Sequence, residues 1–242
     1  PVEVRLNTAP TAGDLKGYDA VLNATGASSY VPDCFGAERV VGFEGVIACP
    51  KVNCEFHPGK RMPVKTGEKV LVWGDHYAAA DTAAYLASIG KDVTVVTEQK
   101  EFGSSVEVIH MYVLRKRFAQ GDAEALESKP FKFPVKVLEN STVYAVREGE
   151  VEVQDKCFNR TKLAIDTVVS CHTRANDAFF AELKQAGIPV FNAGDAVHPR
   201  NLNAAVHEGA MFGLNLDEDM LLNPNGAVMN HLPLDVLGQL KN

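Results

Sequence analysis

The chain has 242 residues, of which 46% are hydrophobic and 23% are charged, as is usual for a globular protein. The 31 acidic and 24 basic residues give a net charge of −7, which argues against nucleic acid or an anionic membrane as a partner. No apolar run approaches the roughly 18 residues of a membrane-spanning helix, and no signal peptide is visible. The five cysteines are odd in number and scattered, so we expect reduced thiols in a cytoplasmic protein.

Two strands are expected first along the chain. Residues 2–6 alternate between apolar and polar side chains, and residues 18–26 read as a buried strand that ends in Ala24-Thr25-Gly26. A buried strand needs a neighbour, and nothing upstream supplies one. We therefore expect a fragment whose first βαβ unit is missing or lies on another chain. Prolines at positions 32, 50, 58 and 63 predict an extended connection over residues 28–67.

The stretch from residue 67 to residue 98 predicts a strand, a helix and a parallel strand. Residues 69–73 and 92–96 are short apolar runs rich in valine, typical of strands buried on both faces. Between them, residues 77–89 carry alanines at helical spacing, and Gly90 ends the helix. This order is typical of the first half of a dinucleotide-binding βαβ unit.

The turn that opens this helix carries an altered glycine fingerprint. The positions of G-x-G-x-x-G/A fall on Gly74, His76 and Ala79, with Asp75 between the first two. Gly74 allows a tight turn and Ala79 allows close packing of helix on strand. His76 stands where a small residue normally lets the backbone approach a pyrophosphate. Two interpretations stay open: a nucleotide site that has decayed while its fold persists, or a histidine that itself pairs with a phosphate.

The middle of the chain predicts one helix, a hairpin and a further buried strand. The helix covers residues 106–120, and strands are expected at residues 135–138, 142–146 and 151–153, with residues 147–150 as the hairpin turn. A buried strand over residues 163–171 then ends in a polar turn at residues 172–177, where the topology would place a site. Another helix is expected at residues 178–186.

The last predicted strand carries the most chemistry. Residues 188–196 end in Gly194-Asp195-Ala196, which places a carboxylate at the carboxyl end of a parallel sheet, where open α/β folds bind ligands. Asp195 is suited to accept hydrogen bonds from sugar or ribityl hydroxyls; the alternative role is a helix N-cap. A helix at residues 201–216, with Asn203 and Ala204 in its first turn, offers N–H groups to the same crevice. Residues 223–242 read as a docking tail or a subunit contact.

No metal site and no redox thiol are predicted. The histidines at positions 172, 198 and 207 lie on different elements without matching carboxylates. Cys171, at a strand end, is expected to be a half-buried structural thiol.

The order of these motifs resembles a known family. Ala24-Thr25-Gly26, the βαβ unit at Gly74, Gly194-Asp195-Ala196 and the Ala-Val-His-Glu-Gly run at residues 205–209 resemble the C-terminal half of the NADH:flavin oxidoreductases, such as 2,4-dienoyl-CoA reductase and trimethylamine dehydrogenase. The resemblance implies an α/β fold of two Rossmann-like three-layer domains. A pyridine-nucleotide-type domain (residues 41–165) would be inserted into a truncated FAD/ADP-type domain (residues 1–40 and 166–242).

The resemblance also implies cofactors and partners. FAD or ADP and NAD(P)H would be the dinucleotide cofactors, whereas FMN and an iron–sulfur cluster would belong to an N-terminal barrel on the same enzyme or a partner chain. Residues 24–26 would lie near the adenine nucleotide or flavin, residues 194–196 would line the flavin, and residues 74–79 would face NAD(P)H. Glu98 would reach a ribose hydroxyl and favour NAD over NADP, although Lys100 leaves that choice open.

Two functions follow from the resemblance. In the first, the chain passes reducing equivalents from NAD(P)H to flavin for reduction of an enoyl-CoA-like or related substrate, and the cofactors carry the chemistry, so no catalytic residue is assigned. In the alternative, it is a degenerate nucleotide-binding or structural module, as in the trimethylamine dehydrogenase branch, and does not use NAD(P)H.

Overall fold

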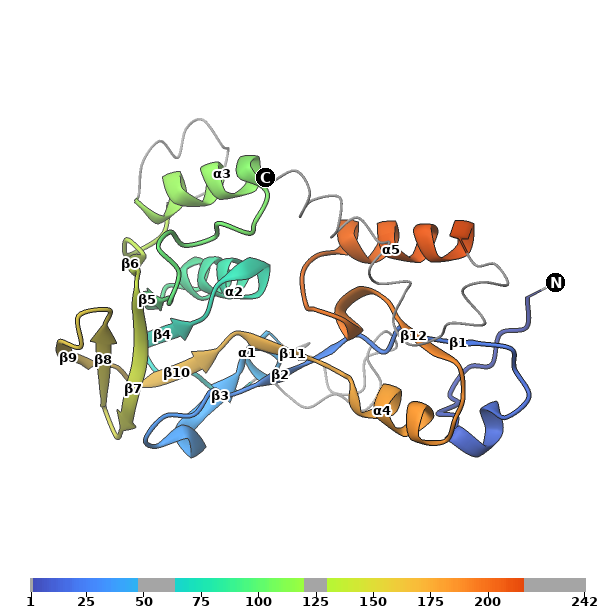
Figure 1. Ribbon diagram of the computed structural model, residues 1–242. Coiled ribbons are helices and arrows are strands. Elements are labelled where there is room, and N and C mark those ends of the chain that lie inside the picture. The colour runs from blue at the N-terminus through green and yellow to red at the C-terminus, as the bar shows by residue number, and fades with distance from the viewer. Residues whose placement is uncertain (1, 48–63, 120–129, 216–242) are drawn as a thin grey trace. The chain divides into compact units, whose positions relative to one another are not determined.

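A computed structural model describes residues 2–47, 64–119 and 130–215 (Figure 1). The chain divides into two compact units. Unit 1 combines residues 1–28 with residues 174–242, and unit 2 comprises residues 29–173. The predicted domain limits at residues 40 and 165, and the nucleotide type of each domain, stay predictions. None of the described helices is long and apolar enough to cross a membrane.

Unit 2 is built on a five-stranded parallel sheet. The strand order is β3-β10-β4-β5-β6, with every neighbouring pair parallel. Its strands are β3 (Val40–Gly42), β10 (Thr167–Ser170), β4 (Lys69–Trp73), β5 (Asp92–Val96) and β6 (Lys136–Leu138). The predicted βαβ unit is present, with α2 (His76–Ser88) connecting β4 to β5. The apolar runs form strands here because both faces of the sheet are covered.

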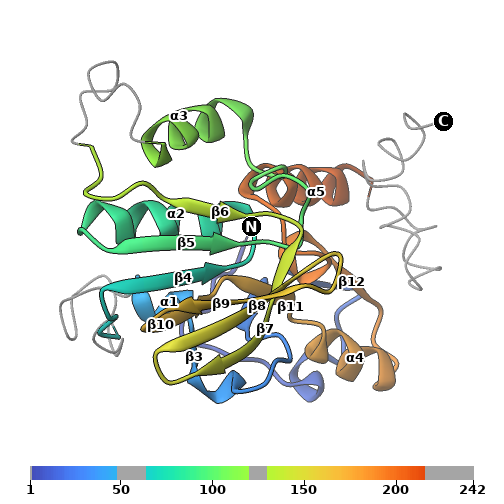
Figure 2. The ribbon, with the colours of Figure 1, turned by 90° about the vertical axis from the view of Figure 1, so that its left-hand side faces the viewer.

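Different layers cover the two faces of this sheet. Val70 and Val72 of β4 pack with α2 and with α3 (Val108–Phe118), whereas Leu71 and Trp73 point to the opposite core. That core is closed by an antiparallel sheet of β7 (Ser141–Arg147), β8 (Glu150–Asp155) and β9 (Arg160–Ala164). Figures 1 and 2 show α2 and α3 on one side of the parallel sheet and β7 to β9 on the other. The α/β fold class is therefore confirmed, with a β-sheet as one outer layer.

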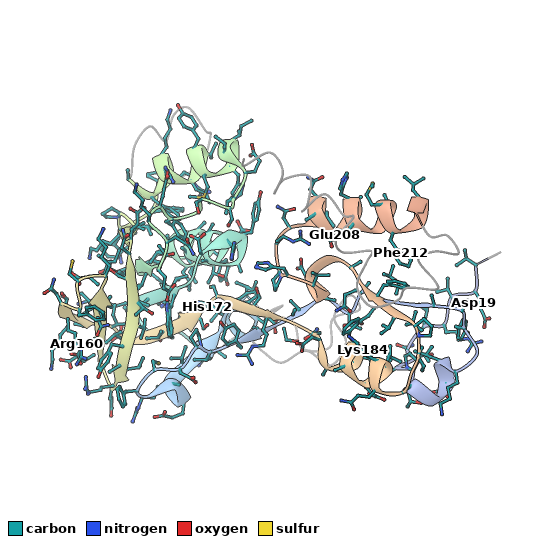
Figure 3. All side chains as sticks on the ribbon, in the orientation of Figure 1. Asp19, Arg160, His172, Lys184, Glu208 and Phe212 are labelled. Atoms are coloured by element: carbon teal, nitrogen blue, oxygen red, sulfur yellow. The ribbon has the colours of Figure 1, made fainter. Side chains whose placement is uncertain are left out.

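Unit 1 contains a pair of parallel strands and two longer helices. β1 (Val21–Asn23) pairs with β12 (Val190–Asn192), so two segments far apart in sequence lie side by side. Residues of α4 (Ala178–Gln185) pack on β12 through Leu183, and α5 (Leu202–Asn215) packs Phe212 against Phe191. Figure 3 labels Phe212 on α5. The remaining short elements of the described residues, taken over both units, are η1 (Ala12–Leu15), β2 (Ala27–Tyr30), η2 (Ala37–Arg39), α1 (Phe43–Val46), β11 (His172–Ala175) and η4 (Gly194–Ala196).

Several predicted elements differ from the structure because their strand partners were misjudged. Residues 2–6 form no strand; Val2, Val4 and Leu6 are exposed, and alternation without a partner does not make a ladder. The strand predicted at residues 18–26 is only β1, and its neighbour comes from downstream as β12. The described part of residues 28–67 is not merely a connection, because it supplies β2 and the edge strand β3.

The strand predicted over residues 163–171 is in fact two strands, β9 and β10. The chain breaks between them at Asp166, whose N–H donates to the Lys69 carbonyl oxygen and whose carboxylate accepts from the Lys69 N–H. The polar turn predicted at residues 172–177 is also wrong in its first part, because residues 172–175 form β11, which pairs with β2. The docking tail lies outside the described residues.

Candidate functional site

The turn after β4 has the tight geometry expected of Gly74. Its φ is 142°, and its N–H donates to the Val96 carbonyl oxygen at 2.9 Å. A Cβ atom at this position would lie 3.2 Å from the Cβ of Cys171. Cys171 is 1% exposed, so it is a fully buried structural thiol rather than a half-buried one. This burial raises the pKa of the thiol to about 12.

His76 occupies the second glycine position with a glycine-like backbone. Its φ is 62°, in the left-handed region that non-glycine residues seldom adopt. The side chain is exposed, and Nδ1 lies 2.5 Å from the Ser105 hydroxyl. The turn thus keeps the backbone of a dinucleotide fingerprint, but the imidazole adds bulk and is bound to the protein itself.

The residues beside His76 hold a neighbouring segment onto the start of α2. Asp75 is only 8% exposed, and its Oδ1 accepts from the Gly103 N–H at 2.8 Å. The Tyr77 hydroxyl accepts from the Glu107 N–H at 2.9 Å. Residues 103–107, which we call the strap, are therefore bound to three successive residues at the N-terminus of α2. Ala79 is fully buried against the sheet, which is the close helix packing predicted for the third position.

Glu98, two residues after the end of β5, is already hydrogen-bonded by protein side chains. Its Oε1 accepts from the Trp73 indole N–H at 2.8 Å and from the Thr142 hydroxyl at 2.7 Å. Its Oε2 lies 3.8 Å from Nε2 of His172, which is labelled in Figure 3. The His172 ring meets that of Trp73 edge-on at 5.0 Å. Sequence reasoning placed a ribose-binding acid here and missed these three partners.

The environment of Glu98 keeps its carboxylate ionised. Partial burial by itself would raise the pKa, but the nearby His172 ring and the hydrogen bonds from Thr142 and Trp73 outweigh that effect and lower the pKa to about 2. The carboxylate is thus an anion at neutral pH, although its side chain is 46% exposed.

This lowered pKa predicts a pH-dependent contribution of Glu98 to stability. Because the pKa falls from 4.5 to about 2 on folding, the contribution is full above about pH 4.5 and is lost as the pH falls toward 2. In urea unfolding, we expect the midpoint difference between wild type and Glu98→Gln to shrink between about pH 5 and about pH 2. Glu148→Gln, in the exposed hairpin turn, is the matched control. A midpoint difference between wild type and Glu98→Gln that is the same at about pH 2 as at about pH 5 would contradict the lowered pKa of Glu98.

In unit 1, the pairing of β1 with β12 brings two predicted segments together. Asn23 Nδ2 donates to Asn192 Oδ1 at 2.8 Å, and the Ala193 N–H donates to the Asn23 carbonyl oxygen at 3.1 Å. Since the strands are parallel and in register, residues 24–26 and 194–196 leave their carboxyl ends side by side. This is the edge at which open parallel sheets bind ligands.

Asn176 braces the Ala24-Thr25-Gly26 segment. Its Nδ2 donates to the Thr25 carbonyl oxygen at 2.9 Å, and its N–H donates to the Gly26 carbonyl oxygen at 3.0 Å. Its Oδ1 accepts from the Ser28 hydroxyl at 2.7 Å. The sequence analysis included Asn176 in a polar turn but gave it no role. The only feature that could have pointed to it is its position two residues before α4.

The Gly194-Asp195-Ala196 turn lies against α5. Gly194 has a φ of 64°, and a Cβ there would lie 3.3 Å from the Cβ of Ala205. Asp195 is half-buried, and its Oδ1 accepts from the Arg200 N–H at 3.0 Å. The N-cap alternative for Asp195 does not hold for α5, because Asn201 Oδ1 accepts from the Ala204 N–H in the first turn. Asn203 lies exposed in the same turn, and Ala196 is buried.

Sequence reasoning missed two charged residues beneath this turn. Glu208 is 2% exposed; its Oε2 accepts from the Gly194 N–H at 2.7 Å, and its Oε1 pairs with the Arg200 guanidinium. The available signal was an isolated acidic residue within an otherwise apolar helix.

The polar groups at this edge fit an adenine nucleotide or flavin. Asn23 is 3% exposed, and its Oδ1 has no hydrogen-bond partner among the residues that the structure describes. A buried amide oxygen without a partner is costly, so it favours a donor from outside the described chain. Asp195 adds a carboxylate acceptor, and the first turn of α5 adds N–H donors. No cluster of three or more potential metal ligands occurs within residues 2–47, 64–119 and 130–215.

Comparisons with known proteins identify the family and the fold of the chain. Residues 4–208 match the pyridine nucleotide-disulphide oxidoreductase family. Cinnamate reductase of Clostridium sporogenes is 33% identical over 102 residues, which cover 41% of this chain and 13% of that protein. The structure of a 2-naphthoyl-CoA reductase complex aligns with a TM-score of 0.66 and 25% identity, over 89% of this chain and 30% of that chain.

A further solved structure shares the fold. Histamine dehydrogenase from Rhizobium sp. 4-9 aligns with a TM-score of 0.61 and 22% identity, over 87% of this chain and 33% of that one. The chain thus spans a third or less of each of these three proteins. The family predicted from the sequence motifs is confirmed.

Proposed function

Because the chain belongs to the pyridine nucleotide-disulphide oxidoreductase family, we propose that it is the nucleotide-binding part of a larger flavin-dependent oxidoreductase and that unit 1 holds FAD or ADP. The observation that carries this proposal is the shared edge of β1 and β12. It brings residues 24–26 beside residues 194–196 and leaves the Asn23 amide oxygen without a partner in the described chain.

Each residue at this edge has a role in the proposal. Asp195 accepts a hydrogen bond from a sugar or ribityl hydroxyl, and the first turn of α5 offers N–H groups to an electron-rich ring edge or phosphate. Residues 24–26, held by Asn176, lie near the adenine nucleotide or flavin. A bound flavin would supply the redox chemistry, and the chain binds and orients it.

In this proposal the Gly74 turn of unit 2 does not bind NAD(P)H, which agrees with the alternative of a degenerate nucleotide-binding module. A pyrophosphate needs an approachable backbone and free N–H groups at the start of the helix. Here the His76 side chain and the strap lie at that position, and the buried Asp75 carboxylate places a negative charge beside it. Glu98, the candidate ribose acceptor, is already bound to Trp73 and Thr142.

A second candidate, NAD(P)H as electron donor at the Gly74 turn, is favoured by other observations. Gly74 and Ala79 keep their fingerprint positions, and Glu98 lies two residues after the second strand. Two relatives are named as reductases, of cinnamate and of 2-naphthoyl-CoA. Under either candidate, we propose an enoyl-CoA-like or related substrate for the whole enzyme. An N-terminal barrel with FMN and an iron–sulfur cluster, and a cytoplasmic location, belong to the same proposal.

Calorimetric titration of the protein with FAD, ADP, NADH and NADPH tests the two candidates. We expect saturable binding of FAD or ADP, weakened about tenfold by Asp195→Asn because a charged hydrogen-bond acceptor is lost. Asp19→Asn, at an exposed aspartate of the same unit, is the matched control and should leave affinity unchanged. Saturable NADH or NADPH binding that changes in His76→Gly would reject the first candidate in favour of the second.

A further inference from the structure

One buried carboxylate connects the two ends of the Gly194 turn. Glu208 projects from α5 (Figure 3) and is 2% exposed. Its Oε2 accepts the Gly194 N–H at 2.7 Å, and its Oε1 pairs with the guanidinium of Arg200, six residues further along the chain. Both oxygens of a single side chain are thus engaged by the segment that contains Asp195.

Arg200 carries this connection to the Asp195 carboxylate. The Arg200 side chain is held by Glu208, and its Nε donates to the His198 carbonyl oxygen at 3.1 Å. The backbone N–H of Arg200 donates to Asp195 Oδ1 at 3.0 Å. Asp195 is therefore fixed from one side through Gly194 and from the other through Arg200. No hydrogen bond reaches Asp195 Oδ2 from the described residues, so that oxygen is left for a ligand.

The energetics of buried charges point to a geometric role for this pair. Desolvation of a carboxylate and a guanidinium offsets much of their attraction, so a buried ion pair is a weak source of net stability. The pair does fix the orientation of the Arg200 side chain, because a guanidinium and a carboxylate interact in a fixed planar arrangement. An apolar pair would fill the same space without orienting Arg200.

We propose that Glu208, together with Arg200, is a positioning residue that holds the Asp195 carboxylate for a hydroxyl group of the bound dinucleotide. The inference rests on the proposed function, in which unit 1 holds FAD or ADP. The hydroxyl belongs either to the ribityl chain or to a ribose. Glu208 itself does not touch the ligand; it acts through the turn and through Arg200.

A double-mutant cycle tests this role. FAD and ADP affinities are measured by titration for wild type, Asp195→Asn, Glu208→Gln and the double variant. We expect each single substitution to weaken binding about tenfold, and the double variant to be about tenfold weaker rather than about a hundredfold, because Glu208 acts through Asp195. Additive losses would overturn the inference, since a merely structural role weakens binding with or without the Asp195 carboxylate.

Two features of the cycle keep its outcome decisive. Glu208→Gln retains an acceptor for the Gly194 N–H, and thermal unfolding is followed for every variant. If Glu208→Gln fails to fold, Arg200→Lys takes its place, because it keeps the positive charge and the N–H to Asp195 but loses the planar fork. The same non-additive result is then expected, and additivity again overturns the inference.

The ligands separate this inference from the proposed function. If the variants lose affinity for FAD but not for ADP, the hydroxyl belongs to the ribityl chain. If they lose affinity for both FAD and ADP, it belongs to the ribose of the adenine half. A wild type that binds neither ligand rejects the proposed function, and the inference with it. A wild type that binds, with additive losses, rejects the inference alone.

Discussion

Replacing Trp73 with alanine is expected to lower the free energy of unfolding of unit 2 by about 4 kcal/mol. The indole is 1% exposed and packs with Leu71 and Val96 in the core between the two sheets. Alanine would leave a cavity there and would also remove the N–H that Glu98 accepts at 2.8 Å. Both losses act on the same face of the parallel sheet.

Trp73→Phe is the matched control, because it keeps an aromatic ring and removes mainly the indole N–H. We expect it to cost about 1–2 kcal/mol, the value of a hydrogen bond to a charged group plus a small packing loss. Urea unfolding should be followed by circular dichroism, since Trp73 is the only tryptophan. Equal losses in the two variants would contradict the packing role given to the indole.

The Gly74→Ala substitution is expected to destabilise unit 2 by about 3 kcal/mol. A φ of 142° lies in a region essentially reserved for glycine, and the added Cβ would lie 3.2 Å from Cys171 Cβ and 3.3 Å from the Cys171 carbonyl carbon. Neither neighbour can retreat easily, because Cys171 is buried and its N–H donates to the Trp73 carbonyl oxygen.

Gly149→Ala separates backbone strain from this close contact. Gly149 also has a positive φ, 70°, but a Cβ there would meet no atom within 4 Å. We expect a loss of about 1 kcal/mol, from strain alone. Urea midpoints measured under one set of conditions compare the two variants, and a Gly74→Ala loss no larger than the Gly149→Ala loss would show that the turn does not require this approach.

Local patterns predicted the elements whose partners are near in sequence. The strands β4 and β5 were predicted because each is a short apolar run, with Gly74 after the first and Gly90 before the second. They also pair with each other, so neither needs a distant partner to be recognised. β1 was different: its neighbour β12 lies 169 residues away at the Asn23–Asn192 contact, and an apolar run carries no information about which distant strand it joins. The same limit made residues 2–6 look like a strand.

The turns at Gly74 and Gly194 were predicted from the sequence, but their contacts were not. Gly74 lies in the tight turn and Ala79 in the buried face of α2, as the fingerprint predicts. The strap, however, depends on contacts such as Asp75 with Gly103, 28 residues apart, which no local motif encodes. Asp195 was singled out from its position after a strand. Glu208 was missed because a lone glutamate on a helix is typical of an exposed face.

In the proposed function, unit 1 binds the dinucleotide and the Gly74 turn of unit 2 does not. Hydrogen–deuterium exchange of the protein with and without FAD, and with and without NADH, tests it most directly because it locates the bound ligand. We predict that FAD slows exchange in residues 193–205 and that NADH leaves residues 74–80 unchanged. Slower exchange at residues 74–80 with NADH, and none at residues 193–205 with FAD, would contradict the account.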